Sequence, residues 1–137
     1  MDDDSKVVWL RSDEVLLRQA HPAQMKGLVP SSQVFIPTAD HSYTLSTRRQ
    51  RFGAKRAYDD HIASDLQSAG TWGVSVSELS SQDLDAFDDS AKDGMPECHV
   101  SIPFGHYESP SATKRTHKMQ ARALKVFAVS RGCLYRP

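Results

Sequence analysis

The sequence predicts an α+β domain in which a mixed or antiparallel sheet carries helices mainly on one face. Three observations lead to this fold class. Short segments alternate apolar and polar residues at the period of a β-strand. Longer segments place apolar residues at helical spacing between and after them. No internal repeat is present, and the two kinds of segment follow one another in an order typical of a single α+β domain.

Length and composition fit one packed domain spanning residues 1–137, with residues 1–6 as a frayed end. Hydrophobic residues make up 39% of the chain and charged residues 25%. Two tryptophans and five phenylalanines supply large side chains for a core. This composition is far from that of a disordered chain.

The first third of the chain contains two clear strand patterns and one ambiguous segment. Residues 7–10 (VVWL) form a short apolar run of strand character. The segment 12–20 fits either a helix capped by Ser12 or a strand, and both remain open. Residues 33–36 (QVFI) are predicted to form a strand.

The segment 43–47 (YTLST) alternates like a half-buried strand and follows a turn at 38–41. Together with the strand at 33–36 it is predicted to form a hairpin. A helix over 54–68 is expected next, because apolar residues recur there at helical spacing. Gly70 would end it.

The segment TWGVSVSEL, from Thr71, has the clearest strand pattern, extending to about Ser77. A short helix over 80–87 and an Asp-rich loop should follow it. Residues 98–104 alternate again, with Val100 and Ile102 on the inner face, and Pro103 makes this an edge strand or ends it early.

A long helix is predicted from Ser111 to about Arg131, after a Ser109 cap and with Gly132 as its stop. Its buried face is expected to contain residues at helical spacing, with Leu124 beside them: Met119, Ala123, Val126 and Phe127. The tail at 133–137 could add one short strand.

Cysteine usage and the termini favour a cytoplasmic protein. Cys98 and Cys133 stand far apart without a CxxC or Cys/His comb, which is typical of unpaired thiols rather than metal ligands. The N-terminus MDDDSK lacks the features of a signal peptide, and no apolar run is long enough to span a membrane.

Charge is strongly segregated along the chain although the formal net charge is zero. A basic run at 48–56 is followed by an acidic stretch at 78–97 and a basic C-terminal segment from 114 onward. Such a layout either steers a partner of opposite charge or pairs internally, and both remain open. The candidate binding residues are Arg48, Arg49, Arg51, Arg56, Lys114, Arg115, Lys118, Arg122 and Lys125.

Five polar residues near the ends of predicted strands form a candidate catalytic set: Arg18, His21, Ser46, Thr47 and Glu78. Their order resembles that of NAD-dependent ADP-ribosyltransferases. The resemblance implies that Arg18 or His21 grips the dinucleotide, that Ser46 and Thr47 brace the site, and that Glu78 stabilises an oxocarbenium-like sugar. The second acidic or polar residue of that family is replaced here by Val76, and the chain is short for that fold.

The remaining histidine and basic motifs are weaker signals. His99 and His106 lie near Cys98 without the local ligand pair that zinc requires, so no metal is predicted. His99-Val100-Ser101 matches one His-x-Ser triplet of acid–base phosphoester chemistry, but His106 does not repeat it. The two basic segments could grip the phosphates of a nucleic acid, although no nucleic-acid-binding motif is present.

Several short motifs spread along the chain carry a further resemblance: "LLRQAHP", "SSQVF-PT", "LS", "AYDDH", "GTWGVSVSE" and "RGCLYRP". The chain is similar in these motifs to a family of short uncharacterised bacterial proteins. The resemblance implies a one-domain bacterial intracellular protein and no particular activity.

The preferred interpretation is therefore a bacterial cytoplasmic binding or accessory protein that contacts another protein through its charge-segregated surface. It needs no cofactor. The alternative is an enzyme that acts on NAD or a nucleotide through the candidate catalytic set, with NAD as its cofactor or substrate. Nucleic-acid binding is the third possibility.

Overall fold

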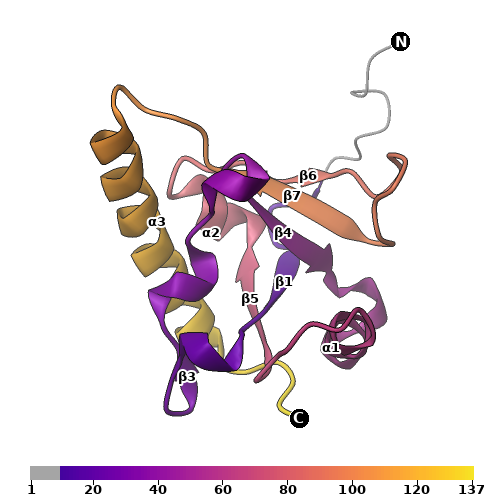
Figure 1. Cartoon of the computed structure of the whole chain (residues 1–137). Helices are drawn as coiled ribbons and strands as arrows, with labels where there is room; N and C mark the ends of the chain where they lie inside the picture. The colour runs from indigo at the N-terminus through magenta and orange to yellow at the C-terminus, as the bar shows by residue number, and fades with distance from the viewer. Residues whose placement is uncertain (1–9) are drawn as a thin grey trace.

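A computed structural model describes residues 10–137 of the chain (Figure 1). The frayed end predicted at 1–6 and residues 7–9 of the first predicted strand lie outside the described residues.

The main sheet is antiparallel and has the strand order β5-β1-β4-β7-β6 (Figure 1). Its strands are β1 (Val15–Gln19), β4 (Thr44–Arg49), β5 (Thr71–Ser75), β6 (Phe87–Asp88) and β7 (His99–Pro103). A separate pair, β2 (Met25–Lys26) and β3 (Val29–Pro30), forms a small ribbon. The predicted α+β class with an antiparallel sheet is confirmed.

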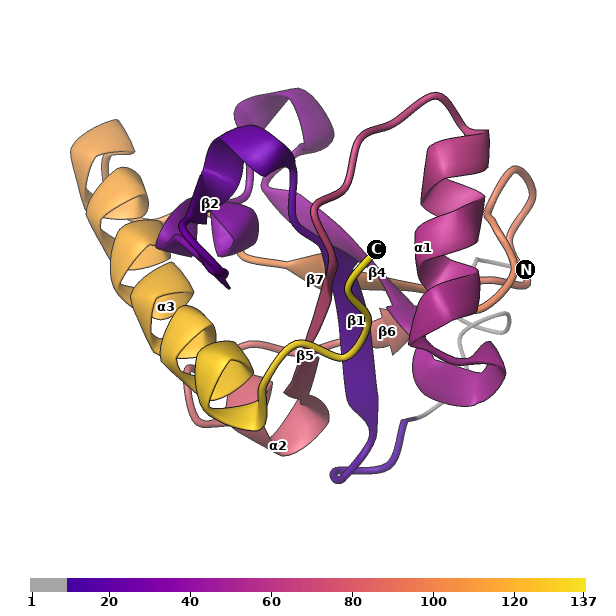
Figure 2. The same cartoon turned by 90° about the horizontal axis from the view of Figure 1, so that it is seen from below.

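Helices cover the sheet unequally (Figure 2). The long helix α3 (Pro110–Arg131) lies on one side of the sheet, and the short α2 (Val76–Ser80) packs between α3 and β5. The 3-10 helix η3 (Ser32–Phe35) also packs against α3. The helix α1 (Ala54–Ala63) lies on the opposite side, where it contacts β1 and β5. Most helical residues therefore pack on one face of the sheet, as expected.

The hydrophobic core lies between the sheet and α3. Leu16 of β1 and Val74 of β5 are paired in register and therefore point to the same face. Trp72, Ile102 and Leu124 are buried in the same cluster. Burial of this apolar surface is the main favourable contribution to folding.

The ambiguous segment 12–20 contains a strand, β1. Leu16 and Leu17 point to opposite faces of the sheet, and both are buried. A surface helix would have left one of them exposed. Strand partners on both sides, β4 and β5, therefore decided the local conformation.

The predicted strand at 33–36 was wrong, and the hairpin with it, because residues 33–35 belong to η3 and Ile36 follows it as the C-cap. The hydroxyl of Ser31 accepts a hydrogen bond from the N–H of Gln33 at 3.3 Å and caps this helix. Val34 and Phe35 still reach the core from it. The serine cap stabilises a 3-10 helix here, although the apolar run by itself favours an extended strand.

The strand predicted to extend to Ser77 ends at Ser75, because Ser75 begins α2. Its hydroxyl accepts from the N–H of Glu78 at 3.1 Å, and the Glu78 carboxylate accepts from the N–H of Ser75 at 2.8 Å. This reciprocal capping box starts the helix at Val76 instead of the predicted residue 80. The last residue of the predicted 80–87 helix, Phe87, belongs to β6 instead.

The buried face of α3 is rotated from the predicted one. Met119 and Val126 are 63% and 59% exposed, whereas His117 and Gln120 are buried. The polar residues satisfy their hydrogen bonds, because the His117 ring is 2.8 Å from the Gly105 carbonyl and the Gln120 amide donates to the Gln82 carbonyl at 2.9 Å. Apolar spacing alone assigned the wrong phase.

Three smaller features complete the fold. The first helix is shorter than predicted, ending at Ala63, and Leu66 is 52% exposed. The predicted C-terminal strand is reduced to one bridge between Thr71 and Tyr135. Within residues 10–137, both cysteines are free thiols and no helix combines the length and apolarity needed to cross a bilayer.

Candidate functional site

A cavity of about 550 Å³ lies on the α1 side of the sheet, bordered by β1, β4, β7 and α1. This volume is within the range of small-molecule sites. Its principal polar lining residues are Arg18, His21, Ser46, Arg48, His61 and His99. Its apolar lining residues are Leu17, Ala57, Leu66 and Pro96. We refer to it as the β1–β4 pocket.

The pocket opens where β1 and β4 separate. These strands pair only at Leu16 with Arg49 and at Leu17 with Arg48. Arg18 is the next residue of β1. There the guanidinium of Arg18, instead of a backbone N–H, donates a hydrogen bond to a carbonyl of β4. Its Nε donates to the Val34 carbonyl at 2.5 Å and its Nη1 to the Ser46 carbonyl at 2.8 Å.

Arg18 carries a positive charge that no acidic side chain balances. Burial lowers the pKa of its guanidinium to about 10, so the group remains charged at neutral pH. Within residues 10–137, none of the ion pairs involves Arg18. A partly buried cation that borders a cavity attracts an anion into that cavity.

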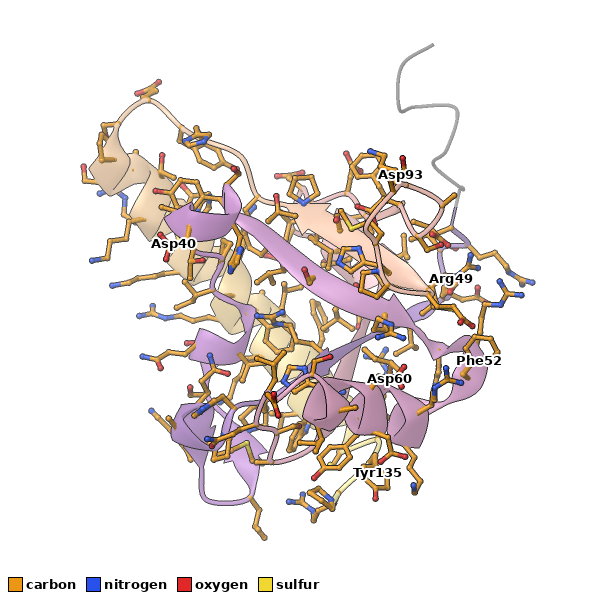
Figure 3. All side chains as sticks on the ribbon, turned by 45° about the vertical axis from the view of Figure 1, so that its right-hand side comes forward. Asp40, Arg49, Phe52, Asp60, Asp93 and Tyr135 are labelled. Carbon is orange, nitrogen blue, oxygen red and sulfur yellow. The ribbon has the colours of Figure 1, made fainter. Side chains whose placement is uncertain are left out.

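Arg48 and His99 occupy adjacent positions on β4 and β7, paired in register. Arg48 Nη2 donates to Asp60 of α1 at 2.9 Å, and Figure 3 labels Asp60 where α1 approaches the sheet. Arg56 also donates to Asp60, at 3.1 Å. Burial alone would raise the pKa of Asp60, but these guanidinium groups lower it below its ordinary value. The Nε–H of Arg48 is buried without a partner among the described residues.

His99 forms a buried pair with Asp89, which follows β6. Its Nδ1 is 2.6 Å from Asp89 Oδ1, and the Ser101 hydroxyl donates to Asp89 Oδ2 at 2.6 Å. His99 and Ser101 are two positions apart on β7, so both side chains reach the carboxylate from one face. A carboxylate at Nδ1 places the proton of the neutral imidazole on that nitrogen and leaves Nε2 as a base.

Two further histidines have their tautomers set by hydrogen bonds to the backbone. Nδ1 of His21 accepts from the N–H of Ala23 at 2.9 Å, which leaves the proton of the neutral ring on Nε2. His61 Nε2 is 3.2 Å from the Gln67 carbonyl. Burial lowers the pKa of His61 below its ordinary value, and the positive charge of Arg18 nearby lowers it further, which favours the neutral ring.

Four of the five predicted catalytic residues line this pocket and one does not. Arg18, His21, Ser46 and Thr47 border it, although the Thr47 hydroxyl donates to the Val100 carbonyl at 3.0 Å. Glu78 is absent from the lining. Its carboxylate caps α2 and accepts two hydrogen bonds from Arg131, at 2.8 and 3.0 Å. The convergence of Arg18, Thr47 and Glu78 that the ADP-ribosyltransferase order requires does not occur.

Sequence reasoning missed the Asp89–His99 pair. The His-x-Ser triplet at 99–101 was a signal for it, because it places both side chains on one face of a strand. Asp89 lies ten residues away in the sequence, on the adjacent short strand's end, and no spacing pattern connects it to His99. The sequence placed His61 on a predicted helix but gave no indication that its side chain lines a pocket.

The basic run at 48–56 is largely paired with acidic side chains. Arg49, labelled in Figure 3, donates to Glu14 at 2.6 and 2.8 Å and to Asp88 at 2.8 Å. The hydrogen bonds that Arg49 donates to the carboxylates of Glu14 and Asp88 raise its pKa despite its burial. Arg48 and Arg56 both pair with Asp60. Among the predicted binding residues of this run, Arg51 alone has no ion pair within the described part of the chain.

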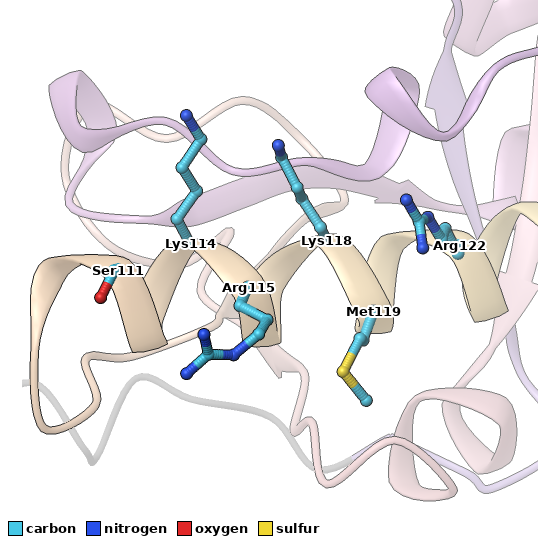
Figure 4. A pocket seen from close by; sticks show the side chains of 6 residues that line it. All are labelled: Ser111, Lys114, Arg115, Lys118, Met119 and Arg122. Carbon is cyan, nitrogen blue, oxygen red and sulfur yellow. The ribbon is translucent and has the colours of Figure 1, made fainter.

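The basic residues of α3 are arranged differently, because within residues 10–137 none of them has an acidic partner except Arg131. Figure 4 shows Lys114, Lys118 and Arg122 in one row along the helix, with Arg115 and Met119 on the adjoining side. They border a shallow hollow of about 340 Å³. We call the exposed side chains the α3 basic face, and its members are Lys114, Arg115, Lys118, Met119 and Arg122.

Comparison with known proteins adds no relative. No protein family matches the chain, and neither a curated protein nor a solved structure matches it. Within residues 10–137, no group of three His, Cys, Asp or Glu side chains is placed to hold a metal ion. The β1–β4 pocket and the α3 basic face are therefore the two features of the protein that indicate a function.

Proposed function

We propose that this protein binds a small molecule carrying a phosphate-type anion in the β1–β4 pocket. The single observation that carries the proposal is the positive charge of Arg18, which has no acidic partner within the described residues. Its guanidinium borders the cavity, remains charged, and has backbone carbonyls but no carboxylate as partners. A guanidinium binds phosphate oxygens through short, charge-assisted hydrogen bonds.

The charges around the pocket favour a ligand with one negative charge. Arg48 is balanced by Asp60, and His99 faces Asp89. Arg18 is the guanidinium of the lining that has no acidic partner within residues 10–137, and one negative charge is enough to pair with it. A phosphodiester carries one negative charge at neutral pH, whereas a phosphomonoester or a pyrophosphate carries more.

The apolar part of the lining indicates what the anion is attached to. Leu17, Ala57, Leu66 and Pro96 form walls without charge. Ligand pockets commonly combine such walls with a few polar groups that fix orientation. A nucleotide-type molecule, with a planar base and one phosphate charge, satisfies both parts. This keeps the predicted nucleotide chemistry without the predicted role of Glu78.

Isothermal titration calorimetry with 3′,5′-cyclic AMP tests the proposal, and adenosine is the matched ligand without the phosphate. We expect cyclic AMP to bind and adenosine to bind at least about tenfold more weakly, which corresponds to 1.4 kcal/mol. Arg18→Met should abolish this difference. Arg122→Met, an exposed arginine on α3, should leave both affinities unchanged. Equal affinities in the wild type would contradict the proposal.

A second candidate function is contact with an acidic protein through the α3 basic face, in an accessory or regulatory role. It is favoured by the contrast between this face and the basic run at 48–56, whose charges are mostly paired within the domain. Met119, 63% exposed, places an apolar side chain among the cations. Mixed apolar and charged surfaces suit protein contacts better than phosphate backbones do.

Fluorescence anisotropy separates the possible partners of the α3 basic face. A poly-glutamate peptide should bind the wild type and not the triple variant Lys114→Glu, Lys118→Glu, Arg122→Glu. A triple variant of basic-run residues would perturb folding, so the control is Arg51→Glu, which should bind normally. Tighter binding of a single-stranded DNA oligonucleotide, lost steeply as salt is raised, would identify a nucleic-acid surface instead.

A further inference from the structure

We infer that His99 is the general base of a phosphodiester hydrolase whose site is the β1–β4 pocket. This inference rests on the proposed binding of a phosphate-type anion there and adds a reaction to it. The geometry that carries it is the buried hydrogen bond between His99 and Asp89, together with the place of His99 in the wall of the pocket.

The Asp89 carboxylate holds the imidazole in the form that a base requires. Oδ1 of Asp89 is 2.6 Å from Nδ1 of His99, and Oδ2 is held by the Ser101 hydroxyl at 2.6 Å. The side chains of His99 and Asp89 are only 9% and 8% exposed. With the proton of the neutral ring on Nδ1, Nε2 carries a lone pair and has no partner within the described residues. A carboxylate in this position also stabilises the imidazolium that forms when the base takes a proton.

Two guanidinium groups border the same pocket as His99, Arg48 on the adjacent strand β4 and Arg18 on β1. Arg48 is paired in register with His99 across β4 and β7, so both side chains project from the same face of the sheet. Arg18 borders the pocket where β1 separates from β4. Arginine side chains on two sides of a phosphoryl group stabilise the charge that its oxygens gain in the transition state.

The other histidines are suited to binding rather than to proton transfer. Nδ1 of His21 accepts from the N–H of Ala23, so its Nε2–H is left as a donor toward a ligand. The low pKa of His61 keeps that ring neutral beside Arg18. Neither histidine has a carboxylate partner among the ion pairs of residues 10–137. His99 is therefore the imidazole that the fold equips as a base.

Water is the nucleophile in this reaction. The hydroxyl of Ser101 donates to Asp89, that of Thr47 to the Val100 carbonyl and that of Ser64 to the Asp60 carbonyl. The ring of His99 has no hydrogen bond to a hydroxyl group within the described residues, including that of Ser46 in the pocket lining. An activated serine or threonine nucleophile would require that contact.

The step consumes one water molecule and one phosphodiester. His99 Nε2 takes a proton from water as its oxygen forms a bond to phosphorus. The bond between phosphorus and the leaving oxygen breaks, and that oxygen keeps the electron pair. The leaving oxygen takes a proton from solvent where its basicity requires one, and His99 releases its proton to solvent. The products are a phosphomonoester and an alcohol or phenol.

Bis(4-nitrophenyl) phosphate is the substrate that tests the base directly, because 4-nitrophenolate leaves without an acid. We expect the wild type to release 4-nitrophenolate and His99→Gln to lower kcat by about 100-fold or more, the range of general-base catalysis. Glutamine can still donate to Asp89, and the melting temperature together with cyclic AMP affinity checks that the pocket is intact. The matched control is His41→Gln, an exposed histidine outside the pocket, which should keep full activity.

Asp89 is a positioning residue, and Asp89→Asn separates positioning from folding. We expect kcat to fall by at least about tenfold with KM unchanged, since the substrate is held by Arg18 rather than by Asp89. A merely structural role would alter KM or the melting temperature instead.

The outcomes for binding and for hydrolysis are distinguishable. A wild type that binds cyclic AMP but does not release 4-nitrophenolate would overturn the hydrolase and leave the proposed binding function standing. Undiminished activity of His99→Gln would likewise overturn the role of His99. Failure of cyclic AMP to bind, with adenosine equally weak, would overturn the binding function itself.

Discussion

Glu78 and Arg131, which are 53 residues apart, form an ion pair with two hydrogen bonds of 2.8 and 3.0 Å. The pair joins the first turn of α2 to the last turn of α3. Arg131 also donates to the Gly73 carbonyl of β5 at 2.9 Å. Burial would raise the pKa of Glu78, but the hydrogen bonds from Arg131 and Ser75 lower it below its ordinary value. The carboxylate is therefore structural.

Glu78→Gln should destabilise the fold without affecting the β1–β4 pocket. Glutamine keeps an oxygen for the N–H of Ser75 but removes the charge that Arg131 faces. We expect a loss of ~1–2 kcal/mol in the free energy of unfolding, measured by urea denaturation. Cyclic AMP affinity should remain that of the wild type. A variant of normal stability with weakened binding would instead place Glu78 in the site.

The phase of α3 can be checked with one buried and one exposed position. Leu124→Ala should cost about 2–4 kcal/mol, because it removes a fully buried side chain and leaves a cavity. Met119→Lys should change the free energy of unfolding by less than about 0.5 kcal/mol, because that residue is 63% exposed. If Met119→Lys were the more damaging change in urea denaturation, the originally predicted buried face would be correct.

Gly73 has no room for a side chain. A methyl group there would lie 2.5 Å from Val15 Cγ1 and 2.9 Å from Leu134 Cδ1. Gly73→Ala should therefore destabilise the domain by about 1–3 kcal/mol through overpacking. The control is Ser80→Ala, at an exposed position of α2, which should stay within about 0.5 kcal/mol of the wild type. Melting temperatures of both variants compare the two positions.

His117 should make stability depend on pH in the mildly acidic range. Its ring is packed edge-on against Tyr43, Phe104 and Tyr107, and it faces the Gly105 carbonyl and His106. Burial lowers the pKa of His117 below its ordinary value of 6.5, with a smaller contribution from His106. Below that pH the unfolded chain binds a proton that the folded one resists, so the free energy of unfolding decreases as pH falls.

Urea denaturation of the wild type and His117→Gln between pH 7.5 and pH 5 measures this contribution. We expect the decrease with falling pH to be smaller in the variant. Glu78 and Asp88 also have lowered pKa values, and their contributions are lost only at more acidic pH, as these carboxylates take up protons. An identical slope in both proteins down to pH 5 would show that His117 does not resist protonation.

The extent to which the fold followed from the sequence differed between elements. The strand pattern at 98–104 and the Ser109 cap of α3 were read correctly, because alternation and capping are local properties. The segment 33–36 has the composition of a strand but forms η3. Its apolar residues reach the core from a 3-10 helix equally well, and Ser31 supplies the cap. Composition does not distinguish the two conformations when both bury the same side chains.

The candidate site was only partly predictable for a related reason. Arg18, His21 and Ser46 could be found as polar residues at the ends of strand-like segments. Asp89 could not, because its importance comes from the pairing of β6 with β7. The ion pairs of Arg49, which was predicted to bind a partner, could not be found from the sequence either. The carboxylates that pair with it, Glu14 and Asp88, are 35 and 39 residues away.

Local sequence was thus sufficient for the fold class, the long C-terminal helix and the segregation of charge, because hydrophobic period, caps and composition act within a few residues. The partners of each charge, the rotation of α3 and the opening between β1 and β4 depend on contacts between distant segments. In these regions the free energy of burying Leu16, Leu17 and Leu124 outweighs the local conformational preference of each segment. The resulting packing brings Arg18, Arg48 and His99 to one pocket. It places Glu78 beside Arg131, away from that pocket.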